Sequence, residues 1–406
     1  MAQAGANAVP PSPLSPRSSL DMAMVAGEAS SDLLASLLLQ GVRQHWPQTA
    51  IHAHGIGGSH MQAQGFEAQW PSERLAVHGY NWEVFKRVAG LLRIRRTLGN
   101  QLLHQRPDVF IGVDAPDFNL GLEQRLRQHG IKTVHFVCPS IWAWRPERVH
   151  AIRQAASHVL CLFPFEPALL AEHGIAATFV GHPLANVIPL QPNAAAARRQ
   201  LQLREDVPVL AILPGSRSSE VQYLLPRFLH AVQWLLNKIP ELQIVLPAVP
   251  AREASLRQQL QASGLTGRVH LLQGQSHLAL QACDVTLIAS GTATLEAALF
   301  KRPMVISYAM HPASAWWMRR KQMQPWIGLP NIMFRDFVVP ELLQDAATPE
   351  ALGQAVLDWL GEDATAQQRR STLQRQFTEL HQSLQADTAH AAAQAIEKVL
   401  SHDAPL

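Results

Sequence analysis

Residues 209–232 read VLAILPGSRSSEVQYLLPRFLHAV, and this stretch decides the fold. Its first five residues are all apolar, as in a strand that is buried on both faces inside a parallel sheet. The turn Pro214-Gly215-Ser216-Arg217 follows, and after it the apolar residues recur at helical spacing. A buried strand that passes through a glycine turn into a helix is the repeating unit of α/β proteins.

The same alternation of short apolar runs and helical patterns covers most of the chain. Such runs, separated by amphipathic stretches, predict parallel strands joined by crossover helices. The runs are MAMVAG (22–27), AIHAHGIGG (50–58), DVFIGVDAPDFN (108–119), KTVHFVCPS (132–140), HVLCLFPFE (158–166), TFVGHP (178–183), VPVLAILPG (207–215), LQIVLPAV (242–249), RVHLLQG (268–274), CDVTLIASG (283–291) and RPMVISYAM (302–310). We therefore predict an α/β fold with two Rossmann-like, doubly wound parallel-sheet domains that face a cleft.

Domain boundaries follow from the breaks in this alternation. Residues 1–20 are rich in Pro, Ser and Ala and are predicted to be a disordered tail. A Pro/Asn/Ala-rich break ends the first series of strands, so residues 21–185 are the first predicted domain and residues 186–406 the second. The C-terminal helices of the second domain are candidates for packing back on the first.

Length and composition agree with two such domains. The chain has 406 residues, of which 47% are hydrophobic and 16% charged, and its net charge is only +3. These values favour a folded protein with a large core and give little support to a nucleic-acid partner.

We find neither an apolar stretch long enough to span a membrane nor a signal peptide, so we expect a cytoplasmic protein. Cys138, Cys161 and Cys283 are far apart in apolar runs and are expected to be structural thiols.

Two strand-to-helix turns of the second domain have the features of a phosphate site. In the first, Gly215 lets backbone N–H groups approach a ligand, and Ser216 and Arg217 add a hydroxyl and a forked donor. The second turn is Ser290-Gly291-Thr292, and Glu296 follows it at a distance where a carboxylate is able to accept both hydroxyls of a ribose. Two such turns suit a diphosphonucleoside. The alternatives are ordinary turns, with Glu296 as a partner of the helix dipole.

The first domain offers a candidate general base. Asp114 and Asp117 follow an apolar strand in RPDVFIGVDAPDFN (106–119), and an Ala-Pro pair between them restricts the loop. A carboxylate at the end of a strand is suited to take the proton of a hydroxyl nucleophile. A divalent metal ion shared by the two carboxylates is the competing interpretation, and a loop cap is a third. His182 and His311 are alternative bases, although each lies beside a proline and a structural role is favoured.

Nine segments, taken in order, resemble the lipid-A-disaccharide synthase family. They are VAGEASSD (25–32), GVDAPDFNL (112–120), CPSIWAWRPERV (138–149), FPFE (163–166), VGHPL (180–184), LPGSRSSEV (213–221), SGTATLEAAL (290–299), LPNIMF (329–334) and PELLQ (340–344). The resemblance extends over nearly the whole chain. It implies a glycosyltransferase of the B-type fold, with an acceptor-binding first domain and a UDP-sugar-binding second domain.

The implied reaction joins UDP-2,3-diacylglucosamine to 2,3-diacylglucosamine 1-phosphate (lipid X) with inversion at the anomeric carbon. Its products are the β-1,6-linked lipid A disaccharide 1-phosphate and UDP. The resemblance implies no metal and no cofactor, and it allows a homodimer. The residues to which it gives roles are Ser30 and Asp32 (first loop, catalysis), Asp117 (the base), Ser216 and Arg217 (phosphates), Glu296 (ribose), and Asn331 and Gln344 (UDP-sugar). Ser290, Gly291 and Thr292 are further predicted UDP-binding residues, because they form the second turn described above.

Three positions depart from the family pattern. Ser31 stands where the family usually has a glycine, so a positive φ there would strain the first loop. Cys138 replaces a common serine, and Ser59 replaces a common proline. These departures concern the shape of the loops more than the identity of the protein.

Two stretches mix basic and apolar side chains in a way that suits an anionic membrane surface. They are WEVFKRVAGLLRIRR (82–96) and WWMRRKQMQPW (316–326). Because diacylated substrates hardly leave a bilayer, we expect peripheral association with the inner face of the inner membrane. The alternatives are an amphipathic core helix for the first stretch and a buried aromatic cluster for the second.

Two other functions are compatible with the same residues. A UDP-N-acetylglucosamine 2-epimerase, or another UDP-sugar transferase of the same architecture, would have a similar nucleotide half. A nucleotide-sugar-binding scaffold protein would keep the fold without the base. The intact DAPDFN segment (114–119) argues against the scaffold.

Overall fold

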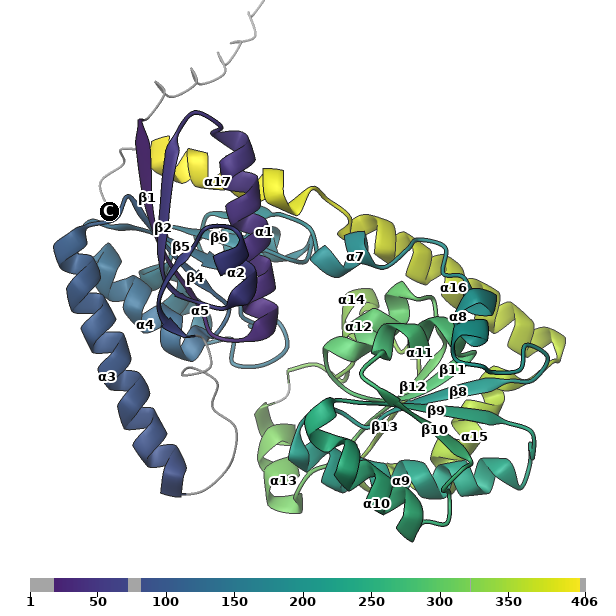
Figure 1. The fold of residues 1–406 in the computed structure, drawn as a ribbon. Coiled ribbons are helices and arrows are strands. Elements are labelled where there is room, and N and C mark those ends of the chain that lie inside the picture. Colours follow the sequence, from purple (N-terminus) through teal and green to yellow (C-terminus); the bar gives the residue numbers. More distant parts are fainter. Residues whose placement is uncertain (1–17, 72–81, 322, 402–406) are drawn as a thin grey trace, which may run out of the picture. The chain divides into compact units, whose positions relative to one another are not determined.

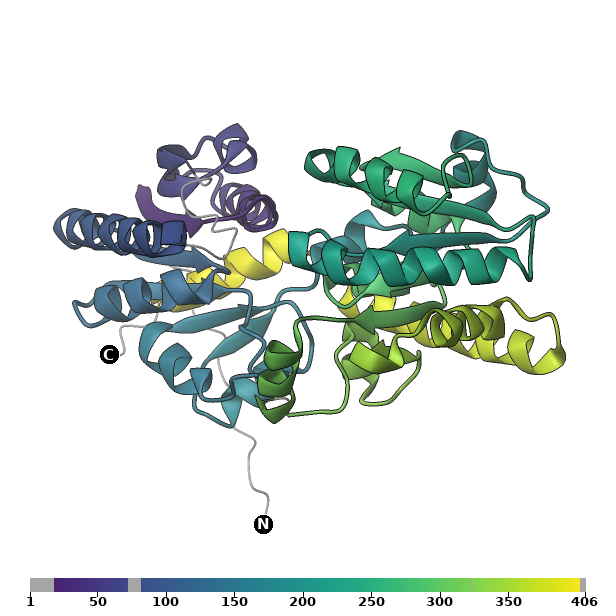
Figure 2. The ribbon, with the colours of Figure 1, turned by 90° about the horizontal axis from the view of Figure 1, so that it is seen from below.

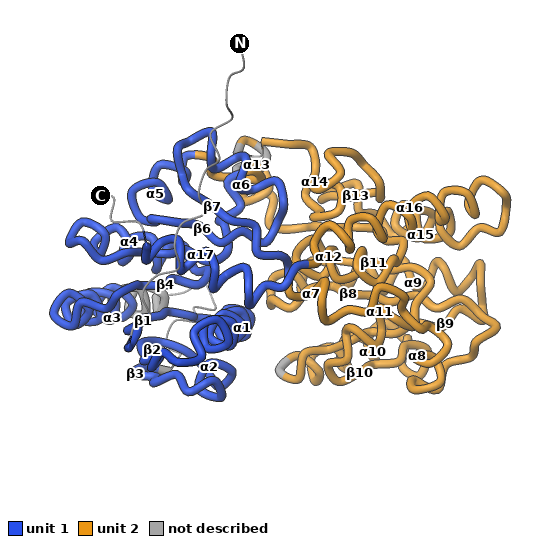
Figure 3. Tube along the Cα trace, turned by 90° about the horizontal axis from the view of Figure 1, so that it is seen from above, with its two compact units in different colours: residues 1–141, 147–182, 386–406 blue, residues 142–146, 183–385 orange. Residues whose placement is uncertain are grey.

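The chain folds into two compact α/β units, shown as a ribbon in Figure 1 and by unit in Figure 3. The computed structural model describes residues 18–71, 82–321 and 323–401. The first unit contains residues 1–141, 147–182 and 386–406, and the second contains residues 142–146 and 183–385. Apart from the short excursion at residues 142–146, the chain passes from the first unit to the second at residues 182–183 and returns at residues 385–386. Most of the predicted disordered tail (1–20) lies outside the described residues, but the first strand begins inside it, at Ser19.

A seven-stranded parallel sheet forms the first unit, in the order β3-β2-β1-β4-β5-β6-β7. Its strands are β1 (Ser19–Ala26), β2 (Ala50–Gly57), β3 (Glu67–Pro71), β4 (Val109–Val113), β5 (Lys132–Phe136), β6 (His158–Cys161) and β7 (Ala177–Phe179). Its helices are α1 (Ala29–His45), α2 (Ser59–Ala63), α3 (Trp82–Gln105), α4 (Pro116–Arg127), α5 (Arg148–Ala155), α6 (Glu166–Ala171) and α17 (Thr388–Ser401). The order of the strands reverses between β1 and β4, which is the switch point of a doubly wound sheet.

Helices cover both faces of this sheet, so its strands are apolar on both sides. On one face, Met22 and Met24 of β1 pack against α1 and α17, including Leu38 and Ile396. On the other face, Ala23 and Val25 pack against α3 and α4. The final helix thus completes the core of the first unit.

A six-stranded parallel sheet forms the second unit and repeats the same order, β10-β9-β8-β11-β12-β13. Its strands are β8 (Val209–Leu213), β9 (Gln243–Ala248), β10 (Val269–Gln273), β11 (Val285–Ala289), β12 (Met304–Tyr308) and β13 (Glu341–Leu343). Its helices are α7 (Pro183–Val187), α8 (Ala194–Gln200), α9 (Ser218–Leu236), η2 (Pro250–Arg252), α10 (Glu253–Ala262), α11 (Ser276–Ala282), α12 (Thr292–Leu299), α13 (Pro312–Lys321), α14 (Leu329–Phe334), η3 (Gln344–Ala346), α15 (Pro349–Leu360) and α16 (Ala364–Leu384). Figures 1 and 2 show helices on both faces of this sheet.

The predicted alternation of parallel strands and helices is confirmed in both units. The three cysteines are free and buried, as expected for structural thiols. No helix among the described residues is long and apolar enough to cross a membrane.

Candidate active site

The turn after β8 is organised around a buried carboxylate that we did not single out in the sequence. Glu220 Oε2 accepts from the backbone N–H groups of Ser216 and Arg217, at 3.1 and 3.2 Å, and Arg217 Nη1 donates to Glu220 Oε1 at 2.9 Å. Gly215 has φ 105°, and a Cβ there would lie 2.4 Å from Glu220 Oε2. The turn is thus held from inside: the Ser216 and Arg217 N–H groups, which we expected to approach a ligand, bond to Glu220 instead. The Arg217 side chain remains 74% exposed at the start of α9. The sequence signal for Glu220 was its position three residues after Arg217, the residue that caps the start of the helix.

The second predicted turn follows β11, the strand that pairs with β8. The two turns therefore lie at the switch point of the second sheet, where ligands of such folds bind. Ser290 Oγ donates to the Ile327 carbonyl at 2.8 Å, and Gly291 has φ 150° ahead of the exposed Thr292 that begins α12. The structure brings these residues and Arg217 to the same end of one sheet.

Glu296 lies in α12 with most of its side chain buried. Burial raises the pKa of its carboxyl group, and the opposing effect comes from His277 of α11, whose Nε2 lies 3.7 Å from Glu296 Oε2. His277 also packs edge-on against Phe300. The sequence carried no signal for His277, because α11 and α12 meet only in the folded unit.

Asn331 is completely buried in α14. Its Nδ2 donates to the Val339 carbonyl and to Glu341 Oε1, at 2.9 and 2.8 Å, and its Oδ1 accepts from the Val339 N–H at 3.0 Å. Glu341 also accepts from the N–H groups of Ile327 and Gly328. In this structure Asn331 holds the 327–341 segment together, and direct contact with a nucleotide would require that segment to open.

Gln344 has a left-handed backbone, with φ 52°. Its Oε1 accepts from the Met310 N–H at 3.3 Å, so the side chain links the end of β13 to the segment that follows β12. A left-handed conformation at a residue other than glycine costs about 1 kcal/mol or more, and such strain gathers at functional sites.

The first loop follows β1 and places Ser30 and Asp32 differently. Ser30 is exposed in the first turn of α1. Asp32 is buried, and its carboxylate accepts from the N–H groups of Gly58, His60 and Met61, at 2.7, 2.9 and 3.2 Å. Asp32 therefore fixes the loop after β2 and the start of α2, which is a positioning role. Ser31 lies inside α1 and has no positive φ, so the strain considered for it does not arise.

The loop after β4 contains two consecutive residues with left-handed backbones, Asp114 (φ 53°) and Ala115 (φ 44°). The buried Asn119 supports this strain, because its Nδ2 donates to the Asp114 carbonyl at 2.8 Å. Beneath the loop, Glu123 Oε1 and His135 Nδ1 form a fully buried pair at 2.7 Å. Gly112 makes room for that pair, since a Cβ there would lie 2.1 Å from Glu123 Oε1.

Asp117 lies in the first turn of α4, beyond this strained turn, and its side chain is 84% exposed. Arg148, the first residue of α5, forms an ion pair with its carboxylate, and Arg95 Nη1 donates to its carbonyl at 3.3 Å. Neither arginine was singled out as a site residue in the sequence, although Arg148 belongs to the CPSIWAWRPERV segment. The loops with Asp32 and Asp117 follow the paired strands β1 and β4, so both lie at the switch point of the first sheet.

The other candidate bases lie in varied surroundings. His311 is exposed just before α13. His182 is buried against the Phe163 ring, and this burial lowers the pKa of its imidazole to about 4. A base with that pKa is weak at neutral pH, which favours a structural role for His182.

The two predicted membrane stretches lie on α3 and on α13 with the segment after it. In α3, Leu92, Arg93 and Arg96 are exposed, whereas Ile94 packs against the core. Trp316 of α13 is 58% exposed, and the Arg320 guanidinium lies 3.8 Å from the centre of its ring. The side chains of residues 82–89, 317, 319, 321 and 322 lie outside the description.

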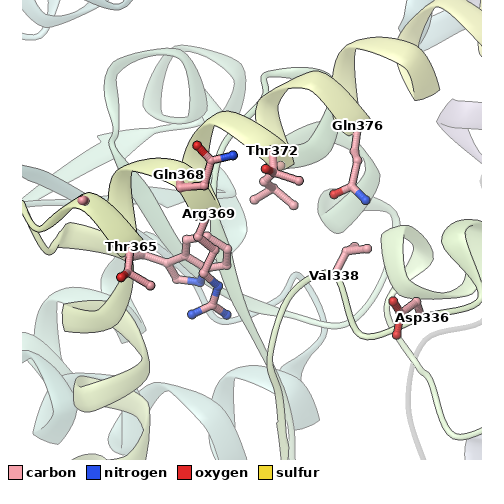
Figure 4. Close-up of a pocket in the computed structure, with 10 residues that line it drawn as sticks. Asp336, Val338, Thr365, Gln368, Arg369, Thr372 and Gln376 are labelled. Atoms are coloured by element: carbon pink, nitrogen blue, oxygen red, sulfur yellow. The ribbon is translucent and has the colours of Figure 1, made fainter.

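A cavity of about 690 Å³ lies along α16, as Figure 4 shows. Thr365, Gln368 and Arg369 of α16 line it, with Asp336 and Val338 opposite. None of its lining residues belongs to the turns after β8 and β11. It is therefore separate from the predicted site residues.

Comparison with known sequences gives matches over almost the full chain. Residues 22–396 match the family of lipid-A-disaccharide synthetases. A lipid-A-disaccharide synthase of Albidiferax ferrireducens is 58% identical over 382 residues, covering 94% of this chain and 97% of that protein. One of Verminephrobacter eiseniae is 59% identical over 383 residues, covering 94% of this chain and 98% of that protein.

Comparison with solved structures supports the fold alone. The UDP-GlcNAc 2-epimerase of Neisseria meningitidis, solved with UDP-GlcNAc bound, superposes with a TM-score of 0.59 at 11% identity, covering 94% of this chain and 99% of that one. At this identity the likeness confirms two Rossmann-like units of the B-type glycosyltransferase architecture and carries no information on the reaction.

Proposed function

The chain belongs to the lipid-A-disaccharide synthase family, and from this premise we infer that its two groups of loop residues serve a single transfer. The protein is a UDP-sugar glycosyltransferase. It joins UDP-2,3-diacylglucosamine to lipid X and releases the β-1,6-linked lipid A disaccharide 1-phosphate and UDP. One observation supports the roles that we assign to the donor-binding residues and to the base. The predicted residues fall into two groups, one at the switch point of each sheet.

The second unit binds the donor in this proposal. Arg217 is exposed at the amino end of α9, where its guanidinium and the helix dipole both favour a phosphate. The amino end of α12 adds backbone N–H groups, and Glu296 accepts the ribose hydroxyls. The partly exposed His277, whose Nε2 lies 3.7 Å from Glu296 Oε2, favours the ionised form of that carboxylate.

The first unit supplies the base. Asp117 takes the proton from the acceptor hydroxyl, the hydroxyl oxygen forms a bond to the anomeric carbon, and the bond from that carbon to the UDP oxygen breaks with inversion. Arg148 orients the Asp117 carboxylate, and the strained turn at Asp114 and Ala115 sets its direction. Arg217 and the two helix amino ends stabilise the charge that develops on UDP, so the reaction needs no metal ion.

We also propose that the protein meets its acylated substrates at an anionic membrane surface. The exposed arginines of α3 and the exposed Trp316 with its stacked Arg320 support this proposal. Arginine and tryptophan side chains are suited to the boundary between water and lipid head groups.

An assay with purified protein tests the reaction directly. The protein is incubated with UDP-2,3-diacylglucosamine and lipid X in EDTA, and the disaccharide and UDP are followed by mass spectrometry and chromatography. We expect both products in equal amounts. Products that form only after a divalent cation is added would overturn metal independence, and conversion of UDP-GlcNAc alone would favour an epimerase.

A further inference from the structure

Three side chains with metal-binding atoms meet on one face of the first sheet. Asp21 lies on β1, and His52 and His54 lie on β2. The two strands are parallel, with Asp21 paired to His52 and Ala23 paired to His54. Because alternate residues of a strand share a face, all three side chains point to the face that α3 covers. Asp21 lies in the amino-terminal half of β1, away from the carboxyl end that carries the first loop.

The distances within this cluster suit a metal ion. Asp21 Oδ1 lies 2.9 Å from His52 Nδ1 and 3.2 Å from His54 Nε2, and one ligand atom of each residue lies within 4.8 Å of the others. Around a tetrahedral zinc ion with bonds of about 2.1 Å, ligand atoms are separated by roughly 3.4 Å. The two distances from Asp21 Oδ1 are close to this value, so small movements of the three groups are enough to admit the ion.

Each histidine also has a partner for its second ring nitrogen. His52 Nε2 lies 3.4 Å from Glu67 Oε2, and His54 Nδ1 lies 3.4 Å from Gln69 Nε2. Histidine ligands of metals almost always bond through the second nitrogen to a carboxylate, carbonyl or water. Glu67 supplies this directly. The Gln69 amide supplies it only after rotation, which turns its oxygen toward His54 and away from Gln101 Nε2, its donor in this structure.

We propose that Asp21, His52 and His54 bind one divalent transition-metal ion, with Zn²⁺ as the preferred occupant and water as the remaining ligand. Two imidazoles and a carboxylate are a ligand set that zinc favours. His54 is only 1% exposed, whereas the His52 side chain is 61% exposed, so the ion is anchored from below and enters from solvent.

The ion joins β1 to β2, which lie next to the edge strand β3 of the first sheet. The bond stabilises the first unit rather than the transfer reaction, because the ligands lie at the other end of the strands from the loop that carries Asp32. The competing explanation is a metal-free ion pair between protonated His52 and the carboxylates of Asp21 and Glu67.

Calorimetric titration of the full-length protein with ZnCl₂, after EDTA treatment and removal of the chelator, separates these explanations. The titration is done at about pH 8, because the hydrogen bond with Asp21 raises the pKa of His52 and a protonated imidazole binds no metal. We expect one Zn²⁺ per chain and a higher Tm when zinc is present. Co²⁺ in place of Zn²⁺ should give the visible absorption of a tetrahedral site.

Variants connect the ion to these residues. His52→Gln should abolish the site and its Tm shift, whereas His104→Gln, which replaces an exposed histidine in α3, should leave both unchanged. Glu67→Gln should weaken zinc binding by about 10- to 100-fold, because it changes only the group behind His52. Absence of zinc binding in the wild-type protein, or equal binding by wild-type and His52→Gln proteins, would overturn the proposal.

Discussion

Asp114 and Ala115 are consecutive residues with left-handed backbones, and neither is glycine. Each costs about 1 to 3 kcal/mol, so the surrounding structure must hold them. Asn119 does so from below through its bond to the Asp114 carbonyl. The strain places Asp117 at the exposed start of α4, which is the position that a base for an external hydroxyl requires.

Asp117→Asn should lower kcat by about 10²- to 10⁴-fold, because the amide keeps the size of the side chain but cannot take a proton. Turnover of both lipid substrates is the measurement, and UDP binding should be unchanged. Asp114→Asn is the matched control and should retain activity within about tenfold. If Asp114→Asn is the more damaging change, Asp114 is the base.

Arg217→Ala should remove about 2 to 4 kcal/mol of transition-state stabilisation, the size of one preorganised donor. Its guanidinium is exposed, and the buried Glu220 keeps its hydrogen bonds from the Ser216 and Arg217 N–H groups, so the Tm should fall little. The measurement is kcat/KM. Arg257→Ala removes a similarly exposed guanidinium, which pairs with the partly buried Glu253, and should leave kcat/KM as it is. Equal activity of the two variants would refute a phosphate role for Arg217.

At the scale of elements, buried carboxylates in both units accept hydrogen bonds from the backbone of turns next to helices. Asp32 joins the start of α1 to the start of α2, and Glu220 closes the turn between β8 and α9. In each case a charged acceptor satisfies backbone N–H groups that a short turn leaves without helical partners. The exposed site residues are therefore held on rigid connections.

Asp32→Ala should lower the free energy of unfolding by about 3 kcal/mol, because buried N–H groups lose a charged acceptor. Unfolding in urea measures this change. Asp32→Asn keeps one oxygen and should lose less. A variant with wild-type stability and no turnover would instead indicate a direct catalytic role for Asp32.

Replacement of Arg93 and Arg96 by Gln should weaken sedimentation with anionic vesicles, since each arginine near such a surface contributes about 1 kcal/mol. Arg95 is left in place, because it donates to the Asp117 carbonyl and its loss would disturb the base. The control carries Gln at Arg199 and Arg257, two exposed arginines of the second unit. Equal sedimentation of the two double variants would exclude α3 as the membrane contact.

At the scale of the whole molecule, buried histidines make stability depend on pH. Burial lowers the pKa of His158 and of His182 to about 4. The unfolded chain takes up these protons first, near pH 6.5, so stability is present above pH 6.5 and is lost as the pH falls toward 4. For the buried His182 this amounts to about 3 kcal/mol.

The Tm should therefore fall steeply between pH 6.5 and 4, as measured by calorimetry. His182→Gln should reduce the slope, because the variant has no imidazole to protonate at that position. A slope identical to that of the wild-type protein would show that His182 does not titrate in this range.

The sequence by itself determined the fold class, the loops and the family. Strands that helices cover on both sides must be apolar throughout, and short turns separate them from helices, so the pattern can be recognised locally in the sequence. The exposed Asp117 and Arg217 were found in this way, because they follow strands directly. Their catalytic roles remain predictions.

Only the tertiary structure decided which strands are neighbours. It placed β4 beside β1 and β11 beside β8, and with them the contacts of Asp117 with Arg148 and of Glu296 with His277. It also brought Asp21 to His52 and His54 and carried α17 back to the first unit. These contacts join residues that are distant in the chain. They depend on the order and the register of the strands, and local sequence patterns do not encode either.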